Sequence, residues 1–479
     1  MLIKFKKLTA RTLEHFNKRP VVYILLISLI VRLLYLLADH PLWWDSHVYI
    51  GMGKYILSVG QFGIWESFRP LVHPTLIGTL WKAGIDPIFG GKCLDLIFSL
   101  IAILLLFKIS DKIFNRKIAI ISSLIFSLTP VFIMHTGLIL TEPLALTLGL
   151  LGIYISLDNK KKWSLFFSGI SLGLAFLTKF TMGIFFAAIL IGLLLKKEQM
   201  ILKIKGLSLI FLGFALSIIP YMAFNYFRYP NLFEPFISGS WIVTTSIWLY
   251  GNGYTYYLRN FFLTNPLYLF FFPYLYYFFK EKEWRNHNKT TFVLISVLTL
   301  IYFTFFVPRK ETRYLLIAIP FMAIAVSQSL RILHNRLKLA KRPVMWPQSF
   351  IVLIVLLLLV PMPANLNFEK APDFKQEING IIAENNITGT VLTSDPSFVS
   401  FLDHPITTLD GTEFAEIKYN ASYGKYELLF INSCDLPCPP GDKGCVKEIN
   451  DFLNKVELEN KVEFSKKNKK CSYKIYLPK

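Results

Sequence analysis

Three cations lie close together in the segment Pro308-Arg309-Lys310-Glu311-Thr312-Arg313-Tyr314. The segment separates two apolar stretches, at 290–307 and 314–330, and is therefore expected to be a turn between two membrane helices. Cations at the outer end of a membrane helix are uncommon unless they bind an anion. Because arginine and lysine hold phosphate by charge-assisted hydrogen bonds, the pattern predicts a phosphate-binding role for Arg309, Lys310 and Arg313.

Two more cations are expected on the same side of the membrane. Arg69 lies in Phe68-Arg69-Pro70-Leu71, and Lys179 follows the apolar stretch at 163–178. Together with the 308–314 turn they would form a clamp for a phosphate or diphosphate. Lys179 alone also fits a lysine whose ammonium extends to the lipid head groups.

Two carboxylates are candidates for acid–base chemistry. Asp45, in Trp43-Trp44-Asp45-Ser46-His47, follows the first apolar stretch and could deprotonate an acceptor hydroxyl. The alternative is that Asp45 caps a helix that begins at Ser46. Glu142 precedes Pro143 at the start of an apolar stretch, where a carboxylate is favoured by the helix dipole whether or not it does chemistry.

Other polar and aromatic side chains near these motifs are candidate substrate contacts, namely His47, Tyr49, His73, His135 and Tyr314. The predicted outer segment 225–265 is rich in Tyr and Trp. Such a surface suits a sugar ring or an isoprenoid chain, and it equally suits an aromatic belt at the membrane interface.

Composition indicates a polytopic membrane protein. The 479 residues are 54% hydrophobic and 16% aromatic, and their mean hydropathy is +0.48. The net charge of +20 would suggest a nucleic-acid partner in a soluble chain, but residues 364–479 carry −3, so the excess belongs to the membrane-flanking part. No nucleic-acid partner is expected.

Eleven apolar stretches predict about eleven transmembrane helices. They lie at 20–38, 88–107, 118–134, 143–157, 163–178, 183–195, 206–224, 266–279, 290–307, 314–330 and 348–362. With the N-terminus in the cytoplasm, the inner loops hold 26 Lys and Arg and the outer loops hold 9. This asymmetry predicts a multi-pass protein of the cell membrane with a cytoplasmic N-terminus and an extracytoplasmic C-terminal part.

Two domains are expected. Residues 1–363 form the membrane domain, with a structured outer loop at 39–87 that contains helices at 46–57 and 71–83. Residues 364–479 form a small α/β domain with helices at 373–385, near 396 and at 446–456, and strands at 389–394, 426–432 and 471–477. Four cysteines in this domain, Cys434, Cys438, Cys445 and Cys471, predict two disulfides of open connectivity.

The order of these motifs resembles the GT-C glycosyltransferases over about residues 20–330. The resemblance is carried by the acidic residue after the first span, Arg69-Pro70-Leu71-x-x-Pro74, the His135–Pro143 loop, Gly173–Lys179 and Arg309-Lys310-Glu311-x-Arg313-Tyr314. Within that class the chain is most similar to the protein O-mannosyltransferase and lipid A aminoarabinose transferase group. Two departures are Leu71, where many relatives have proline, and Ser46, where the protein mannosyltransferases have a second acid.

This resemblance implies an enzyme that transfers a sugar from a polyprenyl- or dolichyl-phosphate carrier to an extracytoplasmic protein, lipid or glycan. Asp45 matches the acidic residue assigned as the base, and Glu142 matches the second acidic position. The expected mechanism is a single displacement with inversion that requires no metal, although Asp45 and Glu142 could hold a divalent ion if they converged. The alternative is a flippase or transporter of lipid-linked sugars, a class that usually has ionisable groups near mid-membrane.

Overall fold

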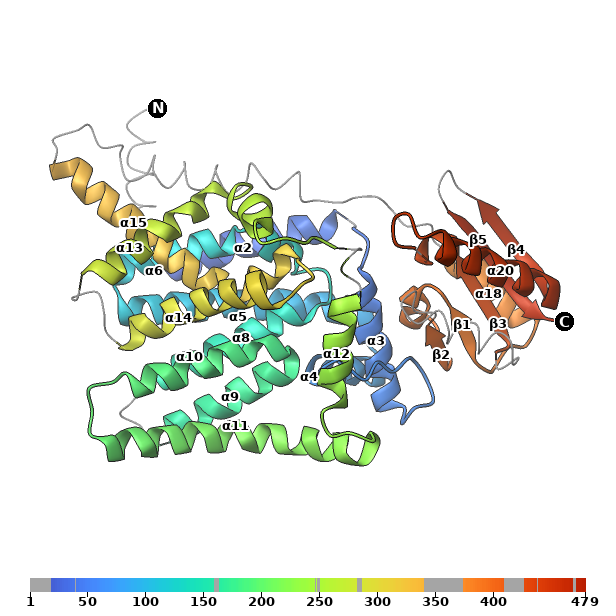
Figure 1. The fold of residues 1–479 in the computed structure, drawn as a ribbon, viewed down its shortest axis with the longest axis horizontal. Coiled ribbons are helices and arrows are strands. Elements are labelled where there is room, and N and C mark those ends of the chain that lie inside the picture. Colours follow the sequence, from blue (N-terminus) through green and yellow to red (C-terminus); the bar gives the residue numbers. More distant parts are fainter. Residues whose placement is uncertain are drawn as a thin grey trace.

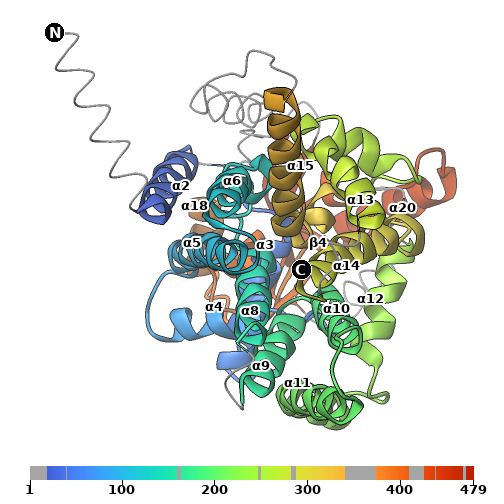
Figure 2. The same cartoon turned by 90° about the vertical axis from the view of Figure 1, so that its left-hand side faces the viewer.

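The computed structural model describes residues 19–38, 40–158, 163–245, 247, 250–281, 287–339, 374–408, 426–436, 438–467 and 471–479. These residues form a large helical region and a smaller α/β domain beside it (Figure 1). The long helices of this region run roughly alongside one another, whereas α3 and α12 run across them (Figure 1). Figure 2 shows α2, α5 and α6 on one side and α10 and α11 on the other. The predicted fold class, a helical region with a small C-terminal α/β domain, is confirmed.

The α-helices of the large region are α2 (Pro20–Leu37), α3 (Trp44–Leu57), α4 (Val72–Lys82), α5 (Pro87–Ile113), α6 (Arg116–Ser127), α7 (Pro130–Met134), α8 (Thr141–Ser156), α9 (Ser164–Thr178), α10 (Gly183–Leu194), α11 (Met200–Arg228), α12 (Glu234–Thr245), α13 (Phe271–Lys280), α14 (His287–Ile301) and α15 (Ile319–Leu339). Short 3₁₀ or π turns lie between several of them: η1 (Phe180–Met182), η3 (Leu258–Phe262), η4 (Pro266–Phe270), η6 (Tyr302–Phe306) and η7 (Thr312–Ile317).

Membrane crossing is supported by the length and composition of these helices. Among the described residues, four helical segments are long and apolar enough to span a bilayer: Pro20–Leu37, Pro87–Ile113, Met200–Arg228 and Asn288–Phe306. Thr141–Ser156, Ser164–Thr178 and Phe180–Leu194 are shorter apolar helices. The predicted polytopic membrane architecture is therefore confirmed. The predicted span at 348–362 lies outside the described residues.

One predicted span is divided in two. The apolar stretch at 118–134 forms α6 and the separate short helix α7, which has Pro130 in its first turn. Proline has no backbone N–H and its ring clashes with the preceding turn, so it begins a helix more readily than it continues one. Hydrophobicity alone marked the stretch but not this break.

Small residues let the membrane helices approach closely. A Cβ atom at Gly169 of α9 would lie 2.1 Å from the carbonyl oxygen of Ile210 in α11, and one at Gly213 would lie 2.0 Å from the carbonyl oxygen of Phe166. Glycine is required at both positions because the two backbones touch. This packing is typical of helix pairs in lipid, where close contact replaces the hydrophobic effect.

In the part of the C-terminal domain that the structure describes, five strands form a mixed sheet, accompanied by two α-helices. Its strands are β1 (Val391–Thr393), β2 (Ile406–Thr408), β3 (Leu428–Asn432), β4 (Asn460–Lys467) and β5 (Ser472–Pro478), in the order β2-β1-β3-β5-β4. The pairs β1–β2 and β1–β3 are parallel, whereas β3–β5 and β4–β5 are antiparallel. Its helices are α18 (Lys375–Glu384) and α20 (Lys443–Glu459), with 3₁₀ turns η8 (Pro396–Ser400) and η9 (Ser433–Asp435).

The sequence predicted three of these strands and missed β2 and β4. β2 is only three residues long, and β4 is an edge strand with charged side chains, so neither has a clear hydrophobic pattern. The two predicted disulfides are present, and they join Cys434 to Cys471 and Cys438 to Cys445.

The C-terminal domain packs directly on α3 (Figure 1). Val48 and Met52 of α3 share one apolar core with Phe398 and Val399 of the small domain. Gly63 continues this contact, because its N–H donates to the carbonyl of His404 at 2.9 Å. The predicted helices at 46–57 and 71–83 are confirmed as α3 and α4, and α3 connects the membrane region to the C-terminal domain.

Candidate active site

Asp45 lies between two arginines that come from different parts of the chain. Its Oδ1 is 2.9 Å from Nη2 of Arg69, and its Oδ2 is 2.7 Å from Nη1 of Arg313. Helix α3 begins at Trp44 and its N-cap is Trp43, so Asp45 is in the first turn and does not cap a helix. The capping alternative is therefore wrong, and the carboxylate instead accepts hydrogen bonds from two guanidinium groups.

Two glutamates extend this arrangement on either side. Glu66 is 2.6 Å from Nε of Arg69. Glu311 is 2.6 Å from Nε of Arg313 and 2.7 Å from Nη2 of Arg309. The six side chains alternate in sign, and we call them the ionic chain: Glu66, Arg69, Asp45, Arg313, Glu311 and Arg309. Their side chains are 11–21% exposed.

The two glutamates were missed by reasoning from the sequence. Their only signal is that Glu66 lies three residues before Arg69 and that Glu311 lies between two arginines. Such neighbours form local ion pairs often enough that they do not by themselves indicate a site. Only the approach of both arginines to Asp45 turns these local pairs into one network.

Aromatic rings surround the arginines. The guanidinium carbon of Arg309 is 3.4 Å from the centre of the Tyr250 ring, and that of Arg69 is 5.0 Å from the centre of the Tyr49 ring. The Tyr314 hydroxyl donates to Oε1 of Glu311 at 2.9 Å. Two of the predicted substrate contacts, Tyr49 and Tyr314, thus lie against the ionic chain, where they orient its cations.

The electrostatics keep Asp45 ionised. Burial alone would raise its pKa, but Arg69 and Arg313 outweigh burial and hold the pKa of Asp45 well below its usual range. Burial would lower the pKa of Arg313, but Asp45 and then Glu311 raise it well above the ordinary value. A carboxylate held in this way is a weak base until at least one arginine takes another partner.

A second polar group lies beside the ionic chain. The centre of the His135 ring is 5.7 Å from that of Trp43, whose ring is 5.4 Å from the Arg313 guanidinium carbon, and the centre of the His73 ring is 5.2 Å from that of Tyr49. Glu142, in the first turn of α8, is 2.9 Å from Nζ of Lys179, which follows α9. His135 approaches the carbonyl of Val131 with Nδ1, at 2.6 Å. Its Nε2 and the Nδ1 of His73 are buried and have no hydrogen-bond partner among the described residues. We call these four residues, Glu142, Lys179, His135 and His73, the Glu142 group.

Lys179 was predicted to join the phosphate clamp or to extend to lipid head groups, and the structure places its ammonium on Glu142 instead. Lys310 also departs from the prediction. Its ammonium donates to the carbonyls of Phe303, Thr304 and Val307 at the end of η6, and it lies outside the ionic chain. A lysine that caps carbonyls left open at a helix end is a structural feature.

His47 also faces away from the ionic chain. Its Nδ1 is 2.6 Å from Oγ of Ser400 in the C-terminal domain. Burial lowers the pKa of His47 to about 4, although Asp395 opposes that shift. Among the candidate substrate contacts, His47 therefore belongs to the junction with the small domain.

Asp45 and Glu142 are each paired with their own cations, and the described residues contain no group of three His, Cys, Asp or Glu side chains placed to hold a metal ion. That the reaction requires no metal stays a prediction. The arrangement places one carboxylate between arginines, and these arginines can bind an anion.

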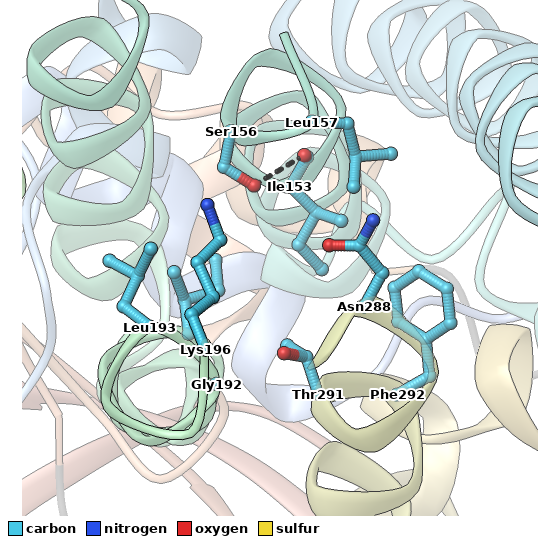
Figure 3. Close-up of a pocket in the computed structure, with 10 residues that line it drawn as sticks. Ile153, Ser156, Leu157, Gly192, Leu193, Lys196, Asn288, Thr291 and Phe292 are labelled. Carbon is cyan, nitrogen blue, oxygen red and sulfur yellow. Dashed lines mark hydrogen bonds between the residues drawn. The ribbon is translucent and has the colours of Figure 1, made fainter. Parts of the chain in front are cut away.

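A separate pocket lies at the far end of α8 (Figure 3). It is lined by residues of α8, α10 and α14 and by Lys196, which pairs with Glu198 at 3.4 Å. Ser156 lines it, 14 residues after Glu142 on the same helix, so the pocket is roughly 21 Å from the Glu142 group. It is not part of the candidate site.

The fold is that of a helical membrane protein with a small C-terminal α/β domain. A family model described as dolichyl-phosphate-mannose-protein mannosyltransferase matches residues 69–224, which include Arg69, Glu142 and Lys179. No curated protein matches the sequence.

Solved structures share the fold at low identity. ArnT from Cupriavidus metallidurans, bound to undecaprenyl phosphate, is 12% identical with a TM-score of 0.65, over 95% of this chain and 97% of that one. The oligosaccharyltransferase AglB from Archaeoglobus fulgidus, in complex with an inhibitory peptide and a dolichol-phosphate, is 12% identical with a TM-score of 0.55, over 87% and 69%. The predicted resemblance to the GT-C glycosyltransferases is confirmed.

Proposed function

We propose that the protein is a glycosyltransferase that moves a sugar from a polyprenyl- or dolichyl-phosphate carrier to an acceptor outside the cytoplasm. The observation that carries this proposal is Asp45 held between Arg69 and Arg313 at 2.9 and 2.7 Å, because one carboxylate and several arginines are what such a transfer requires. The family match and the shared fold support the same class of enzyme.

In the proposed reaction the arginines hold the phosphate of the donor. Arg69, Arg309 and Arg313 would bind its oxygens and stabilise the negative charge that grows on them as the sugar leaves. Stabilisation of this kind contributes on the order of several kcal/mol in a partly dehydrated site. Lys310 would support the 308–314 loop and would not touch the phosphate.

Asp45 would act on the acceptor. When the phosphate takes hydrogen bonds from Arg69 and Arg313, those arginines stabilise the Asp45 charge less, and its pKa rises towards the ordinary value. Asp45 then takes the proton of the acceptor hydroxyl, the acceptor oxygen forms a bond to the anomeric carbon, and the bond from that carbon to the phosphate oxygen breaks. The bonding electrons leave with the lipid phosphate, and one displacement inverts the anomeric configuration.

The Glu142 group would hold the sugar. If Nδ1 of His135 donates to the Val131 carbonyl, its unpartnered Nε2 is an acceptor in the neutral imidazole. The unpartnered Nδ1 of His73 offers a second polar contact. Buried nitrogens without partners carry an energetic cost that sugar hydroxyls would remove. No metal is needed in this scheme, because the arginines supply the positive charge.

A transfer assay with the purified full-length protein tests the proposal. Dolichyl-phosphate mannose and undecaprenyl-phosphate aminoarabinose, each labelled in the sugar, would be the donors, with membrane extract as the acceptor source. We expect the label to leave one carrier and to stay on that carrier with Asp45→Asn. If intact donor crossed the bilayer of proteoliposomes and kept its sugar, the protein would be a flippase and the proposal would be wrong.

A further inference from the structure

The ionic chain is electrically balanced by its own carboxylates. Three arginines alternate with Asp45, Glu66 and Glu311, so their formal charges sum to zero. A phosphate brings one to two further negative charges into this partly buried group. It is therefore bound either beside a carboxylate of the same sign, which is unfavourable, or in place of one.

Glu311 is the carboxylate that a phosphate would meet at the 308–314 loop. Its Oε1 accepts from Nε of Arg309 at 2.7 Å and from Nη2 of Arg313 at 3.3 Å. Its Oε2 is 2.6 Å from Nε of Arg313, whose Nη1 is bonded to Asp45. All three nitrogens of Arg313 thus lie within 3.3 Å of a carboxylate oxygen.

The position of Glu311 in the sequence would make it an effective competitor of a phosphate for Arg309 and Arg313. It lies two residues from each arginine that it binds, so it stays close to both after any displacement. A tethered group competes at a high effective concentration and returns quickly when the rival ligand leaves. Glu66 contacts one arginine of the chain, whereas Glu311 contacts two, and the Tyr314 hydroxyl holds Glu311 in this place.

We infer that Glu311 is an intramolecular competitor of the donor phosphate for Arg309 and Arg313, and that it promotes release of the product lipid phosphate. The inference rests on the proposed function, because it assumes that these arginines bind the phosphate of a lipid carrier. Glu311 limits how tightly that phosphate is held, and its return to the two arginines completes the cycle. It is a positioning residue and takes no part in bond making.

Binding of dolichyl phosphate to the purified full-length protein tests the inference without any transfer assay. Glu311→Gln removes the competing charge and keeps the shape, so we expect the Kd for dolichyl phosphate to fall about tenfold or more. Glu311→Asp keeps the negative charge on a shorter side chain. It serves as the second variant, and we expect its Kd for dolichyl phosphate to fall less than that of Glu311→Gln. Where transfer is measured, KM and kcat should both decrease, because release slows.

Three controls separate competition from other effects. Glu234→Gln, which removes a carboxylate outside the ionic chain, should leave the Kd unchanged. Dolichol, which lacks the phosphate, should bind wild type and Glu311→Gln equally. When Glu311→Gln is added to Arg309→Gln, the gain in affinity over Arg309→Gln alone should be smaller than the gain in wild type, since Glu311 acts through Arg309.

The binding experiment tests the competitor role of Glu311 and the proposed function separately. Unchanged or weaker binding of dolichyl phosphate to Glu311→Gln would overturn the competitor role and show that Glu311 only orients the arginines. If wild type and all variants failed to bind any lipid phosphate, the proposed function itself would be wrong.

Discussion

Helix α3 meets the rest of the protein in two different ways. At its first turn, Asp45 is held by ion pairs to Arg69 and Arg313. Towards the C-terminal domain, Val48 and Met52 are fully buried in a shared apolar core. Ion pairs can exchange partners when an anion arrives, whereas a buried apolar contact has no competing ligand. The first contact is thus suited to chemistry, and the second fixes the helix that presents it.

The ion pair on the domain side does not change this contrast. Lys54 lies 2.8 Å from Asp403, but the Asp403 side chain is 55% exposed, so water screens the pair and it contributes under about 1 kcal/mol. Burial of each large apolar side chain contributes roughly 1.5–3 kcal/mol. The C-terminal domain is therefore held to α3 mainly by burial.

The largest expected effect is on the rate of sugar transfer, and it comes from replacing an aspartate by asparagine at the first of these two contacts of α3 but not at the second. Asp45→Asn removes the proposed base, and the initial rate of sugar transfer should fall about 10²–10⁴-fold. Asp403→Asn makes the same chemical change on the domain side and should leave the rate near that of wild type. A rate for Asp45→Asn within tenfold of wild type would refute the assignment of Asp45 as the base.

The second prediction compares the arginines of the 308–314 loop with Lys310 of the same loop in their effect on donor binding and turnover. Arg309→Gln together with Arg313→Gln should raise KM for the lipid-phosphate donor and lower kcat, because the growing charge on the phosphate is held more strongly in the transition state. The combined loss in kcat/KM should be on the order of 100-fold or more. Lys310→Gln should lower thermal stability more than donor affinity, since its ammonium caps η6. Similar KM changes in both variants would argue against this division of roles.

A smaller effect tests the apolar contact. Met52→Ala leaves a cavity between α3 and the C-terminal domain and should destabilise that junction by about 2–5 kcal/mol. Thermal unfolding and limited proteolysis between residues 374 and 479 would measure the loss. Met200→Ala, at a 66% exposed position of α11, is the matched control and should change neither. An unaltered junction in Met52→Ala would show that burial does not hold the domain.

The smallest effect concerns pH. Because burial lowers the pKa of His47 to about 4, the unfolded chain binds more protons than the folded chain below pH 6.5. Stability is therefore fully present above pH 6.5 and is lost as the pH falls, by about 2 kcal/mol between pH 6.5 and pH 5. Thermal unfolding of His47→Gln over this range should lack that part of the dependence. An identical pH profile for both proteins would exclude His47 as its source.

Much of the fold could be read from local sequence patterns. Helices α3 and α4 follow from the periodicity around 46–57 and 71–83, and the four tail cysteines predict two disulfides. The helices depend on neighbours within a few turns of chain, whereas the number of disulfides followed from the cysteine count and their pairing, which spans 37 residues for Cys434 and Cys471, did not. The short strand β2 and the charged edge strand β4 escaped prediction because their pairing partners, and not their own residues, define them.

For the candidate active site too, some features could be predicted from the sequence and others required the tertiary structure. Residue types and spacing alone identified Asp45, Glu142 and the arginines as candidates and gave the resemblance to GT-C enzymes. Only the tertiary structure joined Asp45 to Arg313 across 268 residues, added Glu66 and Glu311, and gave Lys179 to Glu142 and Lys310 to the carbonyls of η6. A charged side chain reveals its charge in the sequence, but its partner is set by which helices pack together, because Coulomb attraction falls with distance in space and not along the chain.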